Sequence, residues 1–506
     1  MRHRGAITVG LVLCIVVSSC WGLLNSTEQT DALILLYESL QGEHWKRSDN
    51  WKNGEDPCFP GATWYGLYSS NGGPCSIEVA KIILSNNNLT GELPDIFEVF
   101  PSLTEVNMGN ANPINPLPEK VVFGIEGDLP PSLFAPQMEV LNLESNFLSG
   151  NLSPAISNAS SLITLNIGYN FMEGVVPSSL GQLNKLRVLV LCPNNFFGEL
   201  PSFILEFSEL QVLDVGGCRF EGELPLGLAN LSHLNEVQVG YNKFVGPIPP
   251  LSTLAFAGFQ GNRFQGTLPS ELFHSGLLTL RANNNKLNGT LPSEIGLARK
   301  LTELLLFQNK LTGTLPHEMG QLSSLLKLEL QFNKFDGALG DFMCEWKNIR
   351  SRLFLSDNKF TGELPSCLST LTRIRRFDVS LNSLSGQIPT FEDWHDVIAI
   401  YLQANSFSGT IPETLTSSKL QYLQLHYNQL EGTIPSYLND LTSMEILYLH
   451  NNNLTGRIPD VCDINLVTFY DNAGLWCPLP PCCSEEKCRA TEQICCQGEC
   501  INVTLP

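Results

Sequence analysis

Hydrophobic residues recur in this 506-residue chain on a fixed pattern, LxxLxLxxNxLxGx(L/I)P, from Val79 to about Trp476. Sixteen copies and a partial seventeenth are present, and nine of the sixteen spacings between their starts are 24 residues. Self-similarity at such a period indicates a stack of repeats rather than several globular domains. The copies start at Val79, Leu103, Met138, Leu162, Leu186, Leu210, Leu234, Leu254, Leu277, Leu301, Leu325, Arg350, Ile374, Val397, Leu420, Met444 and Ile464.

Each copy predicts one coil with a short strand and a return segment. The LxxLxL run predicts a strand whose leucines turn inward, and neighbouring coils pair into a parallel sheet. Asn at the ninth position turns the chain out of the strand, and its amide can bond backbone groups of two coils, so we expect an asparagine ladder. Cys218 and Ala111 replace this Asn in the sixth and second copies. Gly at the thirteenth position and the Pro that follows predict an extended turn before a short helical or 3₁₀ return.

The LxGx(L/I)P element, present for instance in residues 311–316, resembles the leucine-rich repeats of plant receptor-like kinase ectodomains, receptor-like proteins and polygalacturonase-inhibiting proteins. The resemblance implies an α/β repeat solenoid, a right-handed superhelix with a parallel concave sheet, short helical or 3₁₀ convex returns and disulfide-containing caps. Residues 79–476 then form about 16.5 repeats, residues 23–78 an N-terminal cap and residues 477–506 a cysteine-rich C-terminal cap and tail.

The chain starts with a basic segment and an apolar stretch from Ala6 to Val17, which predicts a signal peptide over residues 1–22. No later stretch reaches the roughly 18 apolar residues of a membrane span, and the C-terminus lacks a GPI signal. We therefore expect a secreted protein in an extracellular space such as the cell wall or apoplast. A bacterial lipoprotein box ending at Cys20 is the alternative, and the repeat type argues against it.

Fourteen cysteines follow the predicted leader, an even number that suits seven bridges in an oxidising compartment. The family pattern implies a bridge between Cys58 and Cys75 in the N-terminal cap. Cys192 and Cys218 lie in adjacent coils, where they form a bridge or Cys218 substitutes for the ladder Asn. Cys344 and Cys367 fit a staple on the convex side. The last eight favour a disulfide knot over zinc, since no His follows His450: Cys462, Cys477, Cys482, Cys483, Cys488, Cys495, Cys496 and Cys500.

Acidic residues outnumber basic ones by 50 to 30, a net charge of -20, which disfavours nucleic acid as a partner. Removing Arg2 and Arg4 with the leader makes it 28 minus 50, or -22. No nucleophile-elbow, zinc-protease, P-loop or kinase signature is present, so we expect no enzyme, cofactor or metal. Eight sequons are predicted glycosylation sites: Asn25, Asn88, Asn151, Asn158, Asn230, Asn288, Asn453 and Asn502.

The repeat register places positions two, three, five, seven and eight of each coil on the solvent side of the concave sheet. Seven of the eleven tyrosines lie there, and five crowd into the last four coils with two histidines one coil apart, which should stack roughly 5 Å apart. Such a cluster suits peptides, protein loops or sugar rings, although aromatic ladders also stabilise exposed sheets. The predicted site is Tyr401, Tyr422, His426, Tyr427, Tyr448, His450 and Tyr470, with Phe307, Phe332 and Phe354 farther along the face. Tyr169 and Tyr241 are the two remaining tyrosines at concave positions.

The paired histidines suggest that binding changes with mild acidity, because stacked imidazoles resist both being charged. The resemblance implies non-covalent recognition of an extracellular protein, peptide or polysaccharide in sensing or defence, with a membrane receptor kinase among the partners. An inhibitor of a secreted polysaccharide-degrading enzyme is a second hypothesis, although those inhibitors have about ten repeats. A structural or adhesive cell-wall protein is a third.

Overall fold

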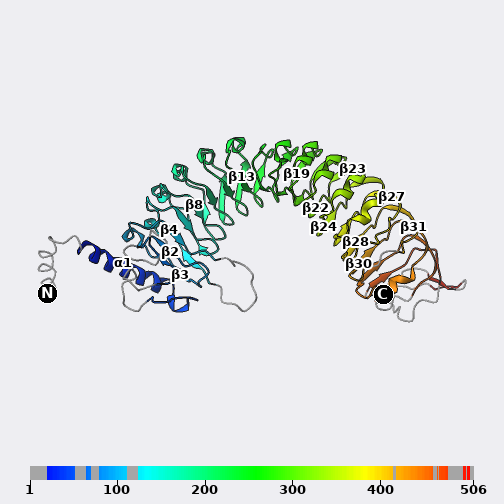
Figure 1. Cartoon of the computed structure of the whole chain (residues 1–506), viewed down its shortest axis with the longest axis horizontal. Coiled ribbons are helices and arrows are strands. Elements are labelled where there is room, and N and C mark those ends of the chain that lie inside the picture. Colours follow the sequence, from blue (N-terminus) through cyan, green and yellow to red (C-terminus); the bar gives the residue numbers. More distant parts are fainter. Residues whose placement is uncertain are drawn as a thin grey trace. The chain divides into compact units, whose positions relative to one another are not determined.

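The computed structural model describes residues 20–51, 64–69, 79–110, 123–413, 417–459, 464, 466–476, 494–496 and 499–501. The chain divides into two compact units, Met1–Lys243 and Phe244–Pro506. Within each unit the repeat coils stack one on the next, and the strands of the main sheet line its concave side (Figure 1).

The first unit starts with a cap that covers the first coil. Helix α1 (Cys20–Ser39) buries Leu33 and Leu36, and Leu40 follows them into the core. Aromatic rings close the cap, since the ring centroids of Trp45 and Trp51 lie 5.0 Å apart and others extend the cluster. Strand β1 (Leu67–Tyr68) pairs antiparallel with β2 (Lys81–Ile83). This segment thus contains a helix and packed tryptophan rings, whereas Cys58 and Cys75 of the predicted bridge lie outside the described residues.

A parallel main sheet runs through the first unit with one strand per coil. Its leucines stay in register, so that Leu165, Leu189 and Leu213 pair across three coils and are fully buried. The alternating pattern of the sequence thus gives the buried row that it predicts. The strands after β2 are β4 (Glu105–Asn107), β6 (Val140–Asn142), β8 (Thr164–Asn166), β10 (Val188–Val190), β12 (Val212–Asp214) and β14 (Glu236–Gln238).

Short strands after the ladder Asn form smaller parallel sheets beside the main sheet, and 3₁₀ helices make the returns. The secondary strands are β3 (Gly91–Glu92), β5 (Ile125–Gly127), β7 (Phe147–Leu148), β9 (Glu173–Gly174), β11 (Asn195–Glu199), β13 (Arg219–Glu223) and β15 (Lys243–Val245). The 3₁₀ helices are η2 (Gly42–His44), η3 (Phe97–Val99), η4 (Pro131–Leu133), η5 (Pro154–Asn158), η6 (Ser178–Gln182), η7 (Ser202–Glu206) and η8 (Leu226–Asn230).

The second unit repeats this plan with greater regularity. Its main strands are β16 (Phe256–Gly258), β18 (Thr279–Arg281), β20 (Glu303–Leu305), β22 (Lys327–Glu329), β24 (Arg352–Phe354), β26 (Arg376–Asp378), β28 (Ala399–Tyr401), β30 (Tyr422–Gln424), β32 (Ile446–Tyr448) and β34 (Leu466–Thr468). Its 3₁₀ helices are η9 (Ser270–Leu272), η10 (Ser293–Leu297), η11 (His317–Gln321), η12 (Asp341–Glu345), η13 (Ser366–Thr370) and η14 (Ser436–Asp440).

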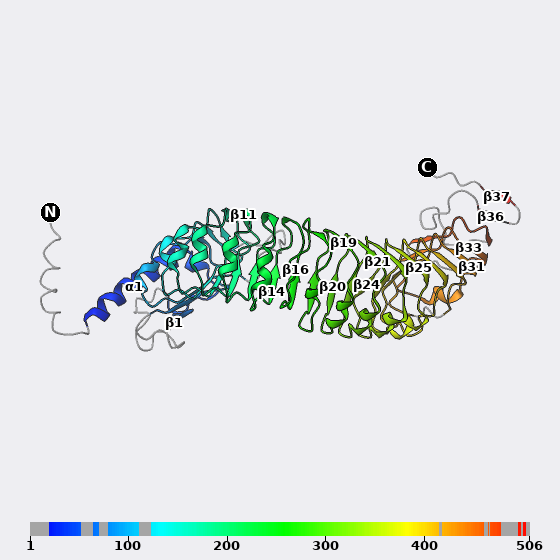
Figure 2. The same cartoon turned by 90° about the horizontal axis from the view of Figure 1, so that it is seen from above.

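A second row of strands also accompanies the main sheet of this unit, and in the orthogonal view β20 and β24 lie in one row and the secondary strands β19, β21 and β25 in another (Figure 2). An antiparallel hairpin, β36 (Ile494–Cys496) with β37 (Glu499–Ile501), lies in the predicted tail. The secondary strands are β17 (Gln265–Gly266), β19 (Lys286–Gly289), β21 (Lys310–Gly313), β23 (Lys334–Ala338), β25 (Lys359–Glu363), β27 (Ser383–Gln387), β29 (Ser406–Gly409), β31 (Gln429–Thr433), β33 (Asn453–Arg457) and β35 (Gly474–Trp476).

The asparagine ladder is present in both units. The Nδ2 of Asn309 donates to the carbonyl of its own coil at Leu306 (3.0 Å) and to that of the preceding coil at Ala282 (2.9 Å), while its Oδ1 accepts from the Leu287 N–H (3.0 Å). Asn333 and Asn358 repeat this geometry. Each amide thereby satisfies buried backbone groups that would otherwise destabilise the coil edges.

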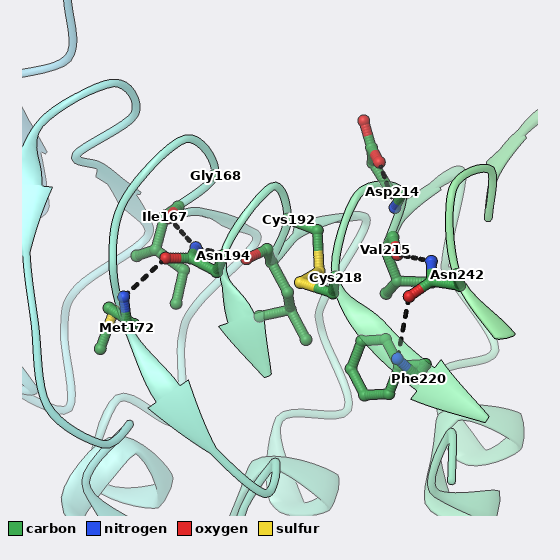
Figure 3. The surroundings of a disulfide bond; sticks show 12 residues. Ile167, Gly168, Met172, Cys192, Asn194, Asp214, Val215, Cys218, Phe220 and Asn242 are labelled. Carbon is green, nitrogen blue, oxygen red and sulfur yellow. Dashed lines mark hydrogen bonds between the residues drawn. A yellow bond between two sulfur atoms is a disulfide. The ribbon is translucent and has the colours of Figure 1, made fainter. Parts of the chain in front are cut away.

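Two of the predicted disulfides lie in the described coils. Cys192 and Cys218 are joined, with 5.7 Å between their Cα atoms, and this bridge lies between the ladder residues Asn194 and Asn242 (Figure 3). The bridge is therefore the alternative that the structure bears out, and it lies at the ladder position of the sixth coil. Cys344 on η12 and Cys367 on η13 form the convex staple, with Cα atoms 5.8 Å apart. The side chains of the other ten cysteines that follow the predicted leader are outside the described residues.

None of the helices in the described ranges combines the length and the hydropathy of a membrane span. The same residues contain no group of three or more His, Cys, Asp or Glu side chains arranged to hold a metal ion.

Candidate functional site

Five aromatic side chains on the concave face of the last coils contact one another. His426 and His450 follow strands β30 and β32 by the same number of residues, and their rings stack with centroids 4.4 Å apart. Tyr470 continues the stack at 4.2 Å from His450. Tyr427 and Tyr448 meet the histidines edge-on, at 5.4 Å and 5.5 Å from His426. We call these five residues the C-terminal aromatic cluster.

Tyr401 and Tyr422 adjoin this cluster on the strands before it. Strands β28, β30 and β32 pair in register, which places Tyr401 beside Gln424 and Tyr448 beside the same Gln424 from the other side. The Tyr422 hydroxyl donates to Oε2 of Glu445 at 2.7 Å, and this hydrogen bond raises the pKa of Tyr422. Burial raises the pKa of Tyr401. Both phenols therefore remain neutral at physiological pH.

The two histidines are neutral as well. Burial, with a smaller contribution from His450, lowers the pKa of His426 from 6.5 to about 4. Only 6% of His450 is exposed, and this burial lowers its pKa, although the Asp471 carboxylate acts in the opposite direction. The Nδ1 of His450 lies 2.6 Å from the Thr468 hydroxyl. The buried Nδ1 of His426 has no hydrogen-bond partner in the described coils, which favours the tautomer with the proton on Nε2.

The histidine geometry changes the expected pH response. The stacking at about one coil spacing agrees with the sequence prediction. Protonation of His426 near pH 4, however, moves its titration below the mildly acidic range that the sequence suggested. Burial lowers the pKa of both imidazoles, so the cluster presents an uncharged surface at neutral pH.

Tyr427 is the most exposed member of the cluster, at 53%. It occupies position eight of its coil, where the backbone enters the left-handed region with φ of 53°. Tyr169 and Tyr241 of the first unit take the same position and conformation, with φ of 55° and 56° and exposures of 42% and 62%. Position eight therefore displays a side chain to solvent wherever a large residue is present.

The three predicted phenylalanines also lie on the second unit's concave face but not in one cluster. The described residues show no ring contact among Phe307, Phe332 and Phe354. Phe332 is 47% exposed at position eight, and the guanidinium of Arg352 lies 5.7 Å from the Phe354 ring. Arg352 and Lys327 both form ion pairs with Glu329, each with a nitrogen 3.1 Å from its Oε1. The Glu329 carboxylate is almost fully buried.

Leu381 is a surface residue that the sequence reasoning missed. It is 52% exposed at position eight, between the phenylalanines and the tyrosines along the chain. The register already assigned this position to the concave face, but only aromatic residues were sought there. Counting every large apolar side chain at position eight would have found it.

Asp214, on the concave face of the first unit, is an unusually weak acid. Asp214 accepts a hydrogen bond from the Gly216 N–H at 2.9 Å (Figure 3). Burial raises its pKa from 3.8 to about 6, and the carboxylates of Glu236 and Glu144 add to the effect. No ion pair to Asp214 is present among the described side chains.

The predicted glycosylation positions avoid the concave face. Asn88 and Asn453 occupy position ten of their coils, Asn151 and Asn288 lie on the secondary strands' side, and Asn158 and Asn230 end the 3₁₀ helices η5 and η8. The side chain of Asn25 and all of Asn502 lie outside the described residues. Glycans at the six described positions would therefore leave the C-terminal aromatic cluster uncovered.

The Leucine Rich Repeat family model matches residues 79–100, 209–231, 351–371, 419–441 and 443–463. No curated protein matches the sequence of this chain.

Solved structures with the same fold include plant receptors. A plant peptide hormone receptor, RGFR1 in complex with RGF2, is 26% identical, with a TM-score of 0.66 over 76% of this chain. The match covers 66% of that receptor chain, just under two thirds of its length. A TDR receptor is 25% identical, with a TM-score of 0.69 over 79% of this chain and 77% of the receptor. The Arabidopsis HAESA ectodomain, bound to an IDA peptide hormone, is 24% identical with a TM-score of 0.61, over 90% and 87%.

Proposed function

We propose that this leucine-rich-repeat chain, which has the fold of plant receptor ectodomains, is a secreted protein that binds an extended peptide on the concave face of its last coils. The observation that carries the proposal is the C-terminal aromatic cluster, five rings linked by ring contacts on a face that none of the six described sequons occupies. The two disulfides in the coils agree with an oxidising, extracellular compartment.

The chemistry of the cluster suits a peptide. Tyrosine offers a large contact area at low entropic cost and a hydroxyl for hydrogen bonds to a backbone. His426, His450 and Tyr470 stack face to face, so their ring faces cover one another, and the exposed Tyr427 ring meets the stack edge-on. A sugar ring binds best on an open aromatic face, so this arrangement favours a peptide over a polysaccharide.

The similarity to a peptide hormone receptor supports the same function, because the RGFR1 structure contains its ligand RGF2. A receptor kinase is the partner class that would transmit such binding across a membrane. An inhibitor of a secreted polysaccharide-degrading enzyme would use the same face, but its ligand would be a folded protein.

Position eight supplies a matched pair of variants for the test. Asn284 and Asn451 occupy it naturally with φ of 57° and 54°, so Tyr427→Asn and Tyr241→Asn fit the backbone. The secreted protein and both variants are used to capture partners from extracellular extract, which mass spectrometry then identifies. We expect peptides that the parent and Tyr241→Asn retain and Tyr427→Asn loses. A glycoside hydrolase captured in this way would favour the inhibitor, and identical captures by all three proteins would contradict the proposal.

A further inference from the structure

The side chains at position eight alternate along coils eleven to fifteen of the second unit. In chain order they are large and apolar, acidic, large and apolar, small, and large and aromatic. We call this row the position-eight ridge: Phe332, Asp357, Leu381, Ala404 and Tyr427. Its apolar members are 47%, 52% and 53% exposed, and they stand on every second coil.

Backbone hydrogen bonds fix the spacing of the ridge. The N–H of Asn333 donates to the Asp357 carbonyl, and the N–H of Asn358 donates to the Leu381 carbonyl, both at 3.2 Å. The next two ladder residues bond in the same way to the carbonyls of Ala404 and Tyr427. Each ridge residue is therefore held one coil from the next, at the strand spacing of about 4.8 Å. Every second coil is about 9.5 Å away.

This distance selects among peptide conformations. In an extended strand, side chains on one face recur about every 6.7 Å, which does not match the apolar side chains of the ridge. A polyproline II helix advances about 3.1 Å per residue with three residues per turn, so its aligned side chains recur about every 9.3 Å. Aromatic-lined surfaces bind this conformation elsewhere because it is preformed and costs little entropy to order.

The charge between the apolar positions adds a second restriction. Asp357 is exposed between Phe332 and Leu381 and has no ion pair in the described coils. When neighbouring ligand residues contact the apolar side chains of the ridge, the residue between them lies near Asp357. A positive charge on that residue would favour binding. Ala404, by contrast, leaves space between Leu381 and Tyr427.

We infer that the concave face of the second unit binds a proline-rich peptide in the polyproline II conformation, with an apolar residue at every third position and a lysine or arginine between the first two. This inference rests on the proposed function and names its ligand class. Phe332, Leu381 and Tyr427 each contact one apolar residue, and Asp357 pairs with the cation.

The test uses the full secreted protein and two synthetic peptides of identical composition. One has leucine at every third residue, a lysine between the first two leucines and proline elsewhere, and the other has leucine at every second residue. We expect the first to bind about tenfold more tightly, and Leu381→Gln or Tyr427→Asn to weaken it about tenfold. Gln308 occupies position eight of its coil with φ of 55°, so glutamine fits this backbone. Tyr241→Asn is the control and leaves the affinity unchanged.

Two further variants distinguish binding that depends on the spacing and charge of the ridge from non-specific apolar binding. Ala404→Phe fills the gap in the ridge, and Phe332 shows that phenylalanine fits this backbone. This variant should bind the first peptide more weakly. If the ridge bound any apolar ligand regardless of spacing, the variant would instead bind the peptide more tightly. Asp357→Lys should weaken binding of the same peptide. Exchanging the lysine of the peptide for glutamate should restore its binding to this variant.

The outcomes distinguish this inference from the function on which it rests. Equal or tighter binding of the second peptide, tighter binding to Ala404→Phe, or failure of both peptides to bind would overturn the polyproline ligand. If Tyr427→Asn still loses peptides from the extract, the proposed function survives any of these results. If Tyr427→Asn retains those peptides, the proposed function is overturned as well.

Discussion

His426 and His450 stack with ring centroids 4.4 Å apart on the concave face, and burial keeps both rings neutral. This pair joins Tyr427 and Tyr448 to Tyr470, so the five rings behave as one surface. Because the two rings face each other, a proton on one disfavours protonation of the other.

Acid should therefore destabilise the last coils. An unfolded histidine binds its proton below about pH 6.5, whereas His426 does so near pH 4, so the unfolded chain binds more protons between these values. Stability is full above pH 6.5 and falls as the pH drops toward 4. His426→Gln, chosen because Gln331 and Gln403 occupy the same position in other coils, should reduce this fall, as thermal unfolding from pH 4 to 7 would reveal. Identical pH profiles for the two proteins would refute the burial argument.

Asp214 should have the opposite dependence. Its pKa of about 6 in the folded state exceeds the 3.8 of the free carboxyl, so the folded chain binds more protons between these values and stability falls as the pH rises through them. Asp214→Asn should stabilise the first unit by about 1 to 2 kcal/mol at pH 7 and leave it unchanged below pH 4. Asn166 holds the equivalent position and bonds the Gly168 N–H in the same way.

Urea denaturation of the Asp214→Asn variant at pH 4 and pH 7 provides the measurement. A stabilisation of equal size at both values would show that the effect is not titration of this carboxylate.

The Cys192–Cys218 bridge should be replaceable by a ladder amide. Cys192→Ser alone removes a loop closure worth about 3 kcal/mol and leaves no amide at position nine. Cys192→Gly with Cys218→Asn should recover part of that loss, because the introduced amide could bond the Leu191 and Val215 carbonyls as Asn242 bonds its own pair. Urea midpoints of the parent, the single and the double variant test this, and a double variant no more stable than the single would contradict it.

The ladder residues should stabilise their own coils locally. Asn309→Ala removes four hydrogen bonds and leaves backbone groups of two coils unsatisfied, at a cost of about 2 to 3 kcal/mol. Hydrogen exchange should accelerate in residues 278–313 and change little elsewhere, since each coil contacts only its neighbours. Asn184→Ala, at an exposed return, is the control. Uniform acceleration along the unit would instead indicate global unfolding.

The sequence predicts the fold well because one pattern specifies every coil. The leucines of LxxLxL, the ladder Asn and the turn Gly act through contacts one coil apart, so their roles follow from the register alone. The same register places Cys192 and Cys218 in adjacent coils.

The candidate site was less predictable, because exposure depends on neighbours. His450 was expected to face solvent, yet only 6% of it is exposed, since the rings of Tyr448 and Tyr470 cover it. Leu381 is exposed because the backbone is left-handed at its position, and sequence alone does not reveal how far this turns a side chain outward. The pKa of Asp214 likewise follows from burial rather than from its neighbours in the chain.

The most direct measurement of the central claim is the affinity of the captured peptide for the parent, Tyr427→Asn and Tyr241→Asn by calorimetry. We predict that Tyr427→Asn weakens binding at least about tenfold while Tyr241→Asn matches the parent, with all three equally stable. Equal affinity of Tyr427→Asn and the parent would contradict a binding role for the C-terminal aromatic cluster and leave it as a stabilising ladder of rings.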